Sequence, residues 1–354
     1  CICSFGIKIY FKGLYMDKSK KKIKIMYLLS SDSYSGAENV VIQIISNLSK
    51  NSDRYDCVYV SKNGSIKTYL ADENIRFALI NTIGLHAIQK IIKKEKPDII
   101  HANDFRASVL SAFSCRNIPI ISHLHNNQPW AKKINFNTLV YFLSTYRYSK
   151  ILTVSQSVQH EYILGAFIKN KVQTIGNPIN IKALQNKAGQ KKTQSINLYD
   201  ITYLGRLTSQ KNPIRFLEII NELKNKLFSL SVIMIGDGEL MNECRGYIKK
   251  HALENCVRLV GFEKNPYQFL EHSKILCMPS QYEGFGLAAV EALAFHIPVV
   301  CTKVGGLPLI VDDTCGKLCT TNQEFVDEIY LLLTDRKYYQ KKKLGASERA
   351  LKLN

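Results

Sequence analysis

The chain has 354 residues, of which 46% are hydrophobic and 22% are charged. This length is too great for one ordinary core and suits two α/β domains. No stretch approaches the roughly 20 uninterrupted apolar residues that span a bilayer. The formal net charge of +19 indicates attraction to phosphates, nucleic acid or an anionic membrane, although a lysine-rich surface without such a partner explains it equally well.

The start of the chain and its cysteines both indicate a cytoplasmic protein. Met16 is typical of a natural start, so we interpret residues 1–15 as upstream read-through and exclude them from the fold prediction. That segment lacks the ordered regions of a signal peptide. The ten cysteines form no C-x-x-C pair, and Cys57, Cys277 and Cys301 lie in apolar runs, as expected in a reducing compartment.

Short apolar runs alternate with amphipathic patterns in two series, which is typical of parallel α/β structure. Helices are expected over 85–94 and from Ser155 or Ser157 towards Ile163. The expected strands of the first series are 23–29, 57–60, 76–80, 98–101, 119–123, 151–154 and 172–175. Those of the second series are 199–204, 231–235, 257–260, 275–278, 298–301 and 317–319.

The break between the two series predicts two doubly wound, Rossmann-like domains, 16–180 and 181–354, which face a cleft between them. A polar stretch over 187–197 is interpreted as a linker or loop. In this fold class, ligands bind beyond the carboxyl ends of the strands and commonly between domains.

The most informative motif is the stretch 279–292, which follows an apolar strand, turns through Gly284 and Gly286, and continues as a helix former. The two glycines let a ligand approach the backbone closely. The N–H groups of Phe285, Gly286 and Leu287 would point out of the helix start, which is a ready site for phosphate.

Two carboxylates flank this turn. Glu283 lies on it, and Glu291 lies about one helical turn after the helix begins. Either carboxylate can accept hydrogen bonds from sugar hydroxyls. For each one alone, the simpler interpretation is a helix-start acid that counters the macrodipole.

A second motif follows the first strand of the second series. Gly205 makes a turn, and Arg206 and Lys211 lie five residues apart. The two cations can clamp a diphosphate, arginine through its planar fork and lysine as a point charge.

Two further turns of the second half follow apolar strands. Gly236 and Gly238 form a G-x-G turn, which a tight strand-to-helix connection explains as well as a ligand does. Gly261 and Phe262 could lie near the base of a nucleotide.

The first half offers a glycine turn and two polar clusters. Gly36 follows the first strand and opens a helix, where a ligand or a simple turn explains it equally well. His101 and Asn103 follow one strand, and His123 and His125 end another. Histidines at strand ends in a cleft can donate to sugar hydroxyls or phosphate.

These motifs together resemble glycosyltransferase family 4 (glycosyl transferases group 1), retaining enzymes of GT-B architecture. The specific part is the E-x7-E signature from Glu283 to Glu291. The G-R-L…K loop at 205–211, the G-x-G-x-L turn at 236–240 and the N-P pair at 177–178 agree with it.

The resemblance implies roles for the donor-side residues. Arg206 and Lys211 would hold the diphosphate, Glu283 would bind donor-sugar hydroxyls, and Glu291 would bind the ribose. The backbone amides of 285–287 would take phosphate and sugar oxygens.

The family's active-site histidine corresponds best to His125, with His123 as the alternative. The chain differs from the family in its single first-turn glycine, Gly36, and in having His101 and Asn103 for the usual histidine pair. The final helix that crosses back to the first domain is expected to be absent or shortened.

The implied activity is a retaining, metal-independent hexosyltransferase that uses a UDP- or GDP-linked sugar and needs no cofactor. The chain has no D-x-D motif. The implied acceptor is a glycan or lipid-linked glycan of a cell-surface polysaccharide such as capsule or lipopolysaccharide. Basic residues in 18–24 and 341–343 would suit peripheral contact with an anionic membrane.

Other functional classes fit less well. A dehydrogenase would require G-x-G-x-x-G after a first strand, which neither half has. A nucleic-acid-binding protein would show aromatic platforms or a recognised module. The alternative that stays open is an inactive or truncated transferase that binds nucleotide sugar without turnover.

Overall fold

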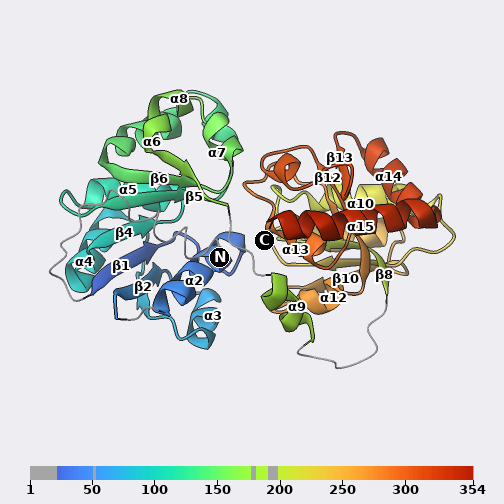
Figure 1. The fold of residues 1–354 in the computed structure, drawn as a ribbon, viewed down its shortest axis with the longest axis horizontal. Coiled ribbons are helices and arrows are strands. Elements are labelled where there is room, and N and C mark those ends of the chain that lie inside the picture. Colours follow the sequence, from blue (N-terminus) through green and yellow to red (C-terminus); the bar gives the residue numbers. More distant parts are fainter. Residues whose placement is uncertain (1–21, 51–52, 177–180, 190–197, 354) are drawn as a thin grey trace. The chain divides into compact units, whose positions relative to one another are not determined.

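The computed structural model describes residues 22–50, 53–176, 181–189 and 198–353 (Figure 1). The chain divides into two compact units, residues 1–178 and 179–354, which we call unit 1 and unit 2. Each unit is a parallel β-sheet covered by helices. The predicted fold class of two Rossmann-like α/β domains is therefore confirmed.

Unit 1 has a seven-stranded sheet of order β3-β2-β1-β4-β5-β6-β7, and all its strand pairs are parallel. The strands are β1 (Ile23–Leu28), β2 (Tyr55–Ser61), β3 (Phe77–Leu79), β4 (Ile99–Ala102), β5 (Ile120–Leu124), β6 (Tyr148–Thr153) and β7 (Val172–Thr174). The helices are α2 (Gly36–Ser49), α3 (Ile66–Asp72), α4 (Leu85–Glu95), α5 (Phe105–Ser114), α6 (Phe136–Ser144), α7 (Gln156–His160) and α8 (Gly165–Ile168).

Unit 2 has a six-stranded parallel sheet of order β10-β9-β8-β11-β12-β13. The strands are β8 (Tyr199–Leu204), β9 (Val232–Ile235), β10 (Val257–Gly261), β11 (Ser273–Met278), β12 (Val299–Thr302) and β13 (Gly316–Cys319). The helices are α9 (Ile181–Gly189), α10 (Pro213–Lys224), α11 (Met241–Lys250), α12 (Tyr267–Leu270), α13 (Leu287–Ala294), α14 (Asn322–Thr334) and α15 (Arg336–Leu353).

Every strand expected from the sequence is present, with ends that shift by a few residues. The strands are apolar on both faces because helices cover both sides of each sheet. In β1, Met26 and Leu28 pack on one side in a cluster with Ile88 of α4. Ile25 and Tyr27, which alternate with them, pack on the other side with α2 and α3.

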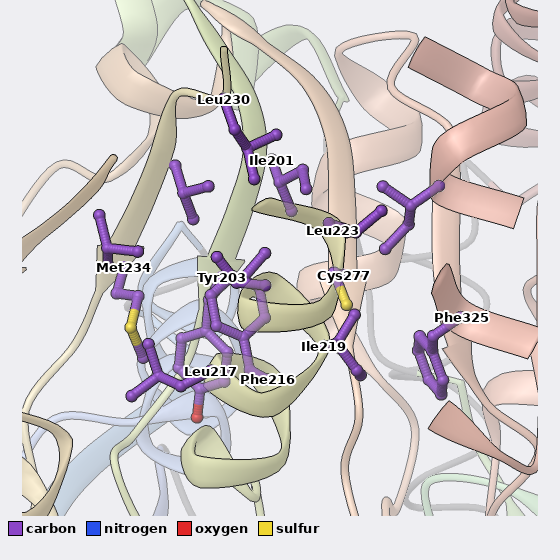
Figure 2. Packing of buried hydrophobic residues seen from close by; sticks show 14 of the residues in the cluster. Ile201, Tyr203, Phe216, Leu217, Ile219, Leu223, Leu230, Met234, Cys277 and Phe325 are labelled. Atoms are coloured by element: carbon purple, nitrogen blue, oxygen red, sulfur yellow. The ribbon is translucent and has the colours of Figure 1, made fainter. Parts of the chain in front are cut away.

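The cores of unit 2 follow the same alternation. Figure 2 shows one of them, in which Tyr203 of β8 packs with Phe216 and Leu217 of α10. Cys277 of β11 belongs to this core, whereas its neighbour Met278 packs on the opposite face of the sheet. This two-sided burial fixes each strand and therefore the loops that follow it.

Two expectations from the sequence are wrong in extent. The helix expected from Ser155 towards Ile163 ends at His160. The Ile163 N–H donates to the carbonyl of Ala131 instead of continuing the helix. The sequence predicts a linker or loop over 187–197, but α9 continues to Gly189.

Several sequence predictions fall outside the described residues: the start at Met16, the N-P pair at 177–178 and the loop residues 190–197. The eight cysteines of the described residues are all free thiols, with Cys277 and Cys301 buried. In the part of the chain that the structure describes, no helix combines the length and apolar character needed to cross a membrane. The basic stretch near the end of the chain forms the helix α15.

Candidate functional site

The two strongest motifs meet at one point of the unit 2 sheet. The strand order reverses between β8 and β11, which are neighbours. The loop 205–211 follows β8, and the turn 279–286 follows β11. In open α/β sheets, ligands bind at such a reversal, beyond the carboxyl ends of the strands. The topology therefore places both motifs at the expected ligand position.

An ion pair joins the two loops. The Lys211 ammonium contacts the Glu283 carboxylate, and the two side chains are 19% and 4% exposed. The Ser280 hydroxyl donates to the same carboxylate oxygen at 2.9 Å. The predicted diphosphate lysine and the predicted sugar-binding glutamate thus contact each other directly.

Gln210 is a second link between the loops, and the sequence analysis did not single it out. Its side-chain oxygen accepts from the Arg206 guanidinium at 3.3 Å, and its side-chain nitrogen donates to the Tyr282 carbonyl at 3.2 Å. Its backbone carbonyl accepts from Gln281 N–H at 2.8 Å. Gln210 is buried whereas Arg206 is exposed, so a buried amide holds one terminal nitrogen of an exposed guanidinium.

The turn after β11 depends on a neighbouring glycine pair that the sequence analysis missed. Gly305 has φ +54°, and a Cβ added to it would lie 1.7 Å from the Glu283 carbonyl oxygen. A Cβ on Gly306 would lie 2.6 Å from the Gly284 carbonyl oxygen. The signal was present in the sequence, since two adjacent glycines follow the strand β12.

The helix α13 begins directly after this turn, as predicted. Gly286 is its N-cap with φ +96°, a left-handed conformation that favours glycine. The N–H groups of a helix's first turn have no acceptor within the helix, so the start of α13 can bind an anion. Glu291 is the fifth residue of α13, and its carboxylate accepts from the Tyr267 hydroxyl at 3.0 Å.

The Gly236–Gly238 turn supports the loop 205–211. A Cβ on Gly236 would lie 1.9 Å from the Gly205 carbonyl oxygen, and one on Gly238 would lie 2.5 Å from the Leu207 carbonyl oxygen. Packing against the neighbouring backbone therefore accounts for both glycines. Gly261 differs, because its φ is +81° and a Cβ there would meet no atom within 4 Å. The adjacent Phe262 is half exposed.

In unit 1, the strand order reverses between β1 and β4. Asp104, which follows β4, accepts from the Ser30 N–H at 2.7 Å and from the Ser30 hydroxyl at 2.9 Å. Gly36 is the first residue of α2 and lies in the loop after β1, next to the N-cap residue Ser35. The Ser35 hydroxyl contacts the buried Glu38 carboxylate.

Three neighbouring histidine rings, which we call the histidine stack, lie beside this reversal. The rings of His101 and His123 are nearly parallel, with centroids 5.3 Å apart, whereas those of His123 and His125 are tilted by 37° with centroids 3.9 Å apart. His125 Nε2 lies 3.3 Å from Asn103 Oδ1. His101, Asn103 and His123 are buried, whereas His125 is partly exposed. Among these candidates, His125 is the one that solvent reaches.

The stack is uncharged at neutral pH. Desolvation lowers the pKa of His101 and of His125 to about 3, and lowers the pKa of His123 well below its ordinary value. Both ring nitrogens of His123 are buried without a hydrogen-bond partner among the described residues. Within those same residues, no group of three or more His, Cys, Asp or Glu side chains is arranged to hold a metal ion.

Sequence models of two families match the chain, one after the other. The model described as "Glycosyltransferase Family 4" matches residues 34–183, and the model described as "Glycosyl transferases group 1" matches residues 185–349. Together the two matches span both units.

Curated proteins that are similar to this chain are also glycosyltransferases by their names. An Escherichia coli UDP-Gal:alpha-D-GlcNAc-diphosphoundecaprenol alpha-1,3-galactosyltransferase is 25% identical over 88% of this chain and 84% of its own length. An N-acetylgalactosaminyltransferase of Campylobacter jejuni, which acts on a diphospho-undecaprenol-linked sugar by its name, is 33% identical over 54% of this chain. An uncharacterised glycosyltransferase of Methanocaldococcus jannaschii is 29% identical over 61% of this chain. The chain spans 53% of the length of the Campylobacter relative and 58% of that of the Methanocaldococcus relative.

Solved structures agree in fold. HepE from Anabaena, in complex with UDP and glucose, superposes with a TM-score of 0.79 over 94% of this chain and 97% of its own, at 22% identity. TarM from Staphylococcus aureus superposes with a TM-score of 0.75 at 14% identity, over 94% of this chain and 97% of its own.

Proposed function

Because the chain belongs to the glycosyltransferases of family 4 and group 1, we propose that it transfers a hexose from a UDP- or GDP-linked donor, with retention of anomeric configuration and without a metal ion. The acceptor is a glycan or lipid-linked glycan in the assembly of a cell-surface polysaccharide. The observation that carries this proposal is the convergence of Arg206, Lys211 and Glu283 at the strand-order reversal of unit 2.

The donor diphosphate would lie between the loop 205–211 and the start of α13. Arg206 is exposed there, Lys211 is partly exposed, and the first-turn N–H groups of α13 add partial positive charge. Cleavage of the bond between the anomeric carbon and the phosphate oxygen passes through an oxocarbenium-like state and leaves negative charge on the departing diphosphate. Positioned cations and N–H groups stabilise that charge in the transition state, so these residues can supply the largest part of the rate enhancement.

Glu283 and Glu291 would bind hydroxyls of the donor. Glu283 is held by Lys211 and Ser280 at the turn, which suits contact with the sugar next to the reacting carbon. Glu291 lies further along α13 and is oriented by Tyr267, which suits contact with the ribose. Gly261 would allow close approach of the base, with Phe262 beside it.

His125 is the histidine that we assign to the reaction. It is partly exposed at the end of β5, and desolvation keeps its ring neutral, so it can either donate or accept a hydrogen bond. His101, Asn103 and His123 are buried and would act through His125, as positioning residues.

The acceptor class rests on the relatives. By their names, the Escherichia coli and Campylobacter proteins act on diphosphoundecaprenol-linked sugars, and an Erwinia amylovora relative, 25% identical over 88% of this chain, acts in amylovoran biosynthesis. We propose a lipid-linked glycan acceptor for this chain as well, and a cytoplasmic protein that works at the inner face of the membrane.

A nucleotide-binding experiment tests the donor class. UDP, GDP and ADP are added to the wild type and to Glu291→Gln in EDTA, and the melting temperature is followed. A ligand at a hundredfold excess over its Kd stabilises the folded state by about 2.7 kcal/mol. One nucleotide should give a clear shift in EDTA, weakened in Glu291→Gln. No shift with any nucleotide would overturn the proposed donor site.

Product analysis tests the chemistry. The donor is a sugar conjugate of the nucleotide that gives the shift in melting temperature. The anomeric configuration of the product, determined by NMR, should match that of this donor, and an inverted product would exclude retention. Nucleotide binding without transfer to a lipid-linked acceptor or to water would instead support the alternative of an inactive transferase.

A further inference from the structure

Unit 1 carries an exposed apolar face on the segment after β5. On α6, Phe136, Leu139 and Leu143 are 79%, 47% and 61% exposed. Tyr146 and Phe167 are each 75% exposed. Single exposed apolar side chains are ordinary, but a contiguous group of them marks an interaction surface.

These side chains form one face. The three α6 residues recur at i, i+3 and i+7, so they lie along one side of the helix. The half-buried ring of Phe142 links α6 to the other two residues, with its centroid 6.3 Å from that of Tyr146 and 6.1 Å from that of Phe167. Figure 1 shows α6 and α8 next to each other at one side of unit 1. We call Phe136, Leu139, Leu143, Tyr146 and Phe167 the α6 face.

The surroundings of the α6 face are strongly basic. Between residues 129 and 174, the chain has six lysines and arginines against one acidic residue, Glu161. Glu161 is paired with Lys132 at 3.2 Å. Lys133 precedes α6 and Lys169 follows α8, and both are exposed.

We propose that the α6 face docks on an anionic lipid bilayer. Its aromatic and aliphatic side chains would enter the interfacial region, and Lys133 and Lys169 would lie against lipid phosphates. This combination of an apolar face and flanking lysines is what binds helices to the plane of a charged membrane. Tyrosine, here Tyr146, also favours the boundary between headgroups and acyl chains.

The charge argues against a second copy of the chain as the occupant. A symmetric contact through this face would bring the basic residues of both copies together, with one acid per copy to offset them. An anionic bilayer instead supplies phosphates to the exposed Lys133 and Lys169. The inference rests on the proposed lipid-linked acceptor, since a docked unit 1 would remain beside a substrate that stays in the membrane.

Vesicle sedimentation tests the inference. The full chain is mixed with phosphatidylcholine vesicles that contain or lack phosphatidylglycerol, and the bound fraction is measured. Wild type should bind the phosphatidylglycerol vesicles and be released by salt. Binding should fall at least tenfold in Lys133→Glu/Lys169→Glu, because each lysine near such a surface contributes about a fivefold factor. Binding should also fall at least tenfold in Phe136→Gln/Leu143→Gln, because this variant removes two of the apolar side chains that would enter the bilayer.

Two matched controls distinguish binding through the α6 face from non-specific adsorption of an exposed aromatic residue and from an effect of net charge. Phe228→Gln replaces a fully exposed aromatic of unit 2. Lys249→Glu/Lys250→Glu changes net charge by the same amount at two exposed lysines of α11. Both controls should bind vesicles as the wild type does. Equal loss in the α11 variant would mean that net charge alone drives binding, and it would overturn the inference.

Two other results would also overturn it. One is equal binding of the wild type and the Phe136→Gln/Leu143→Gln variant. The other is a wild-type dimer in sedimentation that this variant converts to monomer, because the face would then be a self-association surface. UDP binding, measured on each variant, should be unchanged, so a failure of the proposed donor site appears separately from a failure of membrane docking.

Discussion

The ammonium of Lys211 and the carboxylate of Glu283 form a largely buried ion pair, with side chains 19% and 4% exposed, although the two residues lie 72 positions apart in the chain. The pair connects the loops after β8 and β11 at the reversal of strand order. Removing one member of such a pair leaves the other as an uncompensated charge in a poorly solvated place.

The Lys211→Met variant should therefore lose stability as well as activity. We expect the free energy of unfolding to fall by about 3 to 5 kcal/mol, because Glu283 stays buried without its partner. Lys211→Met/Glu283→Gln should recover most of this loss, since neither charge remains. Urea unfolding of the three proteins measures both effects.

An exposed ion pair provides the control. Lys274 contacts Asp200 at 2.8 Å, and their side chains are 47% and 21% exposed. Lys274→Met should cost no more than about 1 kcal/mol. If Lys211→Met were as mild as this control, the buried pair would not hold the two loops together.

Gln210 should affect nucleotide binding without contacting the nucleotide. Gln210→Met keeps the side-chain volume but removes the hydrogen bonds to Arg206 and to the Tyr282 carbonyl. We expect UDP to bind about tenfold or more weakly, because the two lost hydrogen bonds contribute about 1 kcal/mol each. Titration calorimetry with UDP gives the Kd directly.

A charged replacement and a distant one extend the test. Gln210→Glu places a carboxylate against the Tyr282 carbonyl and pairs it with Arg206, so its Kd for UDP should be at least as high as that of Gln210→Met. Gln323→Met, which removes an exposed hydrogen bond to Asp327 on α14, should leave the Kd unchanged. A wild-type Kd for Gln210→Met would mean that the two hydrogen bonds do not position Arg206 for the nucleotide.

The sequence predicts the strands well because buried strands carry a dense apolar signal that helices on both faces require. It predicts Arg206, Lys211 and Glu283 as site candidates because each follows such a strand. It does not reveal that Lys211 and Glu283 contact each other, since that depends on which strands become neighbours. Gln210 has no pattern of its own, and its role comes from a contact with the distant turn at Tyr282.

Gly305→Ala should disturb the glutamate turn. A Cβ at this position would lie 1.7 Å from the Glu283 carbonyl oxygen, and its φ of +54° disfavours any other residue. We expect a loss of about 1 to 3 kcal/mol in the free energy of unfolding, together with weaker UDP binding because Glu283 and Gly284 must move. Gly246→Ala is the control, since a Cβ there meets nothing within 4 Å in the helix α11. That change should stabilise the chain by about 0.5 to 1 kcal/mol. Equal effects of the two substitutions would show that the turn tolerates displacement.

The histidine stack should make the stability of unit 1 depend on pH. Desolvation lowers the pKa of His123 well below its ordinary value, and the pKa of His101 and His125 to about 3. The unfolded chain then binds protons more readily than the folded one, so the stabilisation is complete above about pH 6.5 and is lost as the pH falls towards 3.

Each histidine held neutral in this way contributes a slope of up to about 1.4 kcal/mol per pH unit. His123→Phe fills the same buried place, removes one proton-binding group and leaves no unpaired ring nitrogen. Urea unfolding between about pH 7 and pH 4 should show a flatter decline for this variant than for the wild type. His86→Gln, at an exposed position on α4, should keep the wild-type slope. A His123→Phe slope equal to that of the wild type would mean that the folded stack takes up protons as easily as the unfolded chain does.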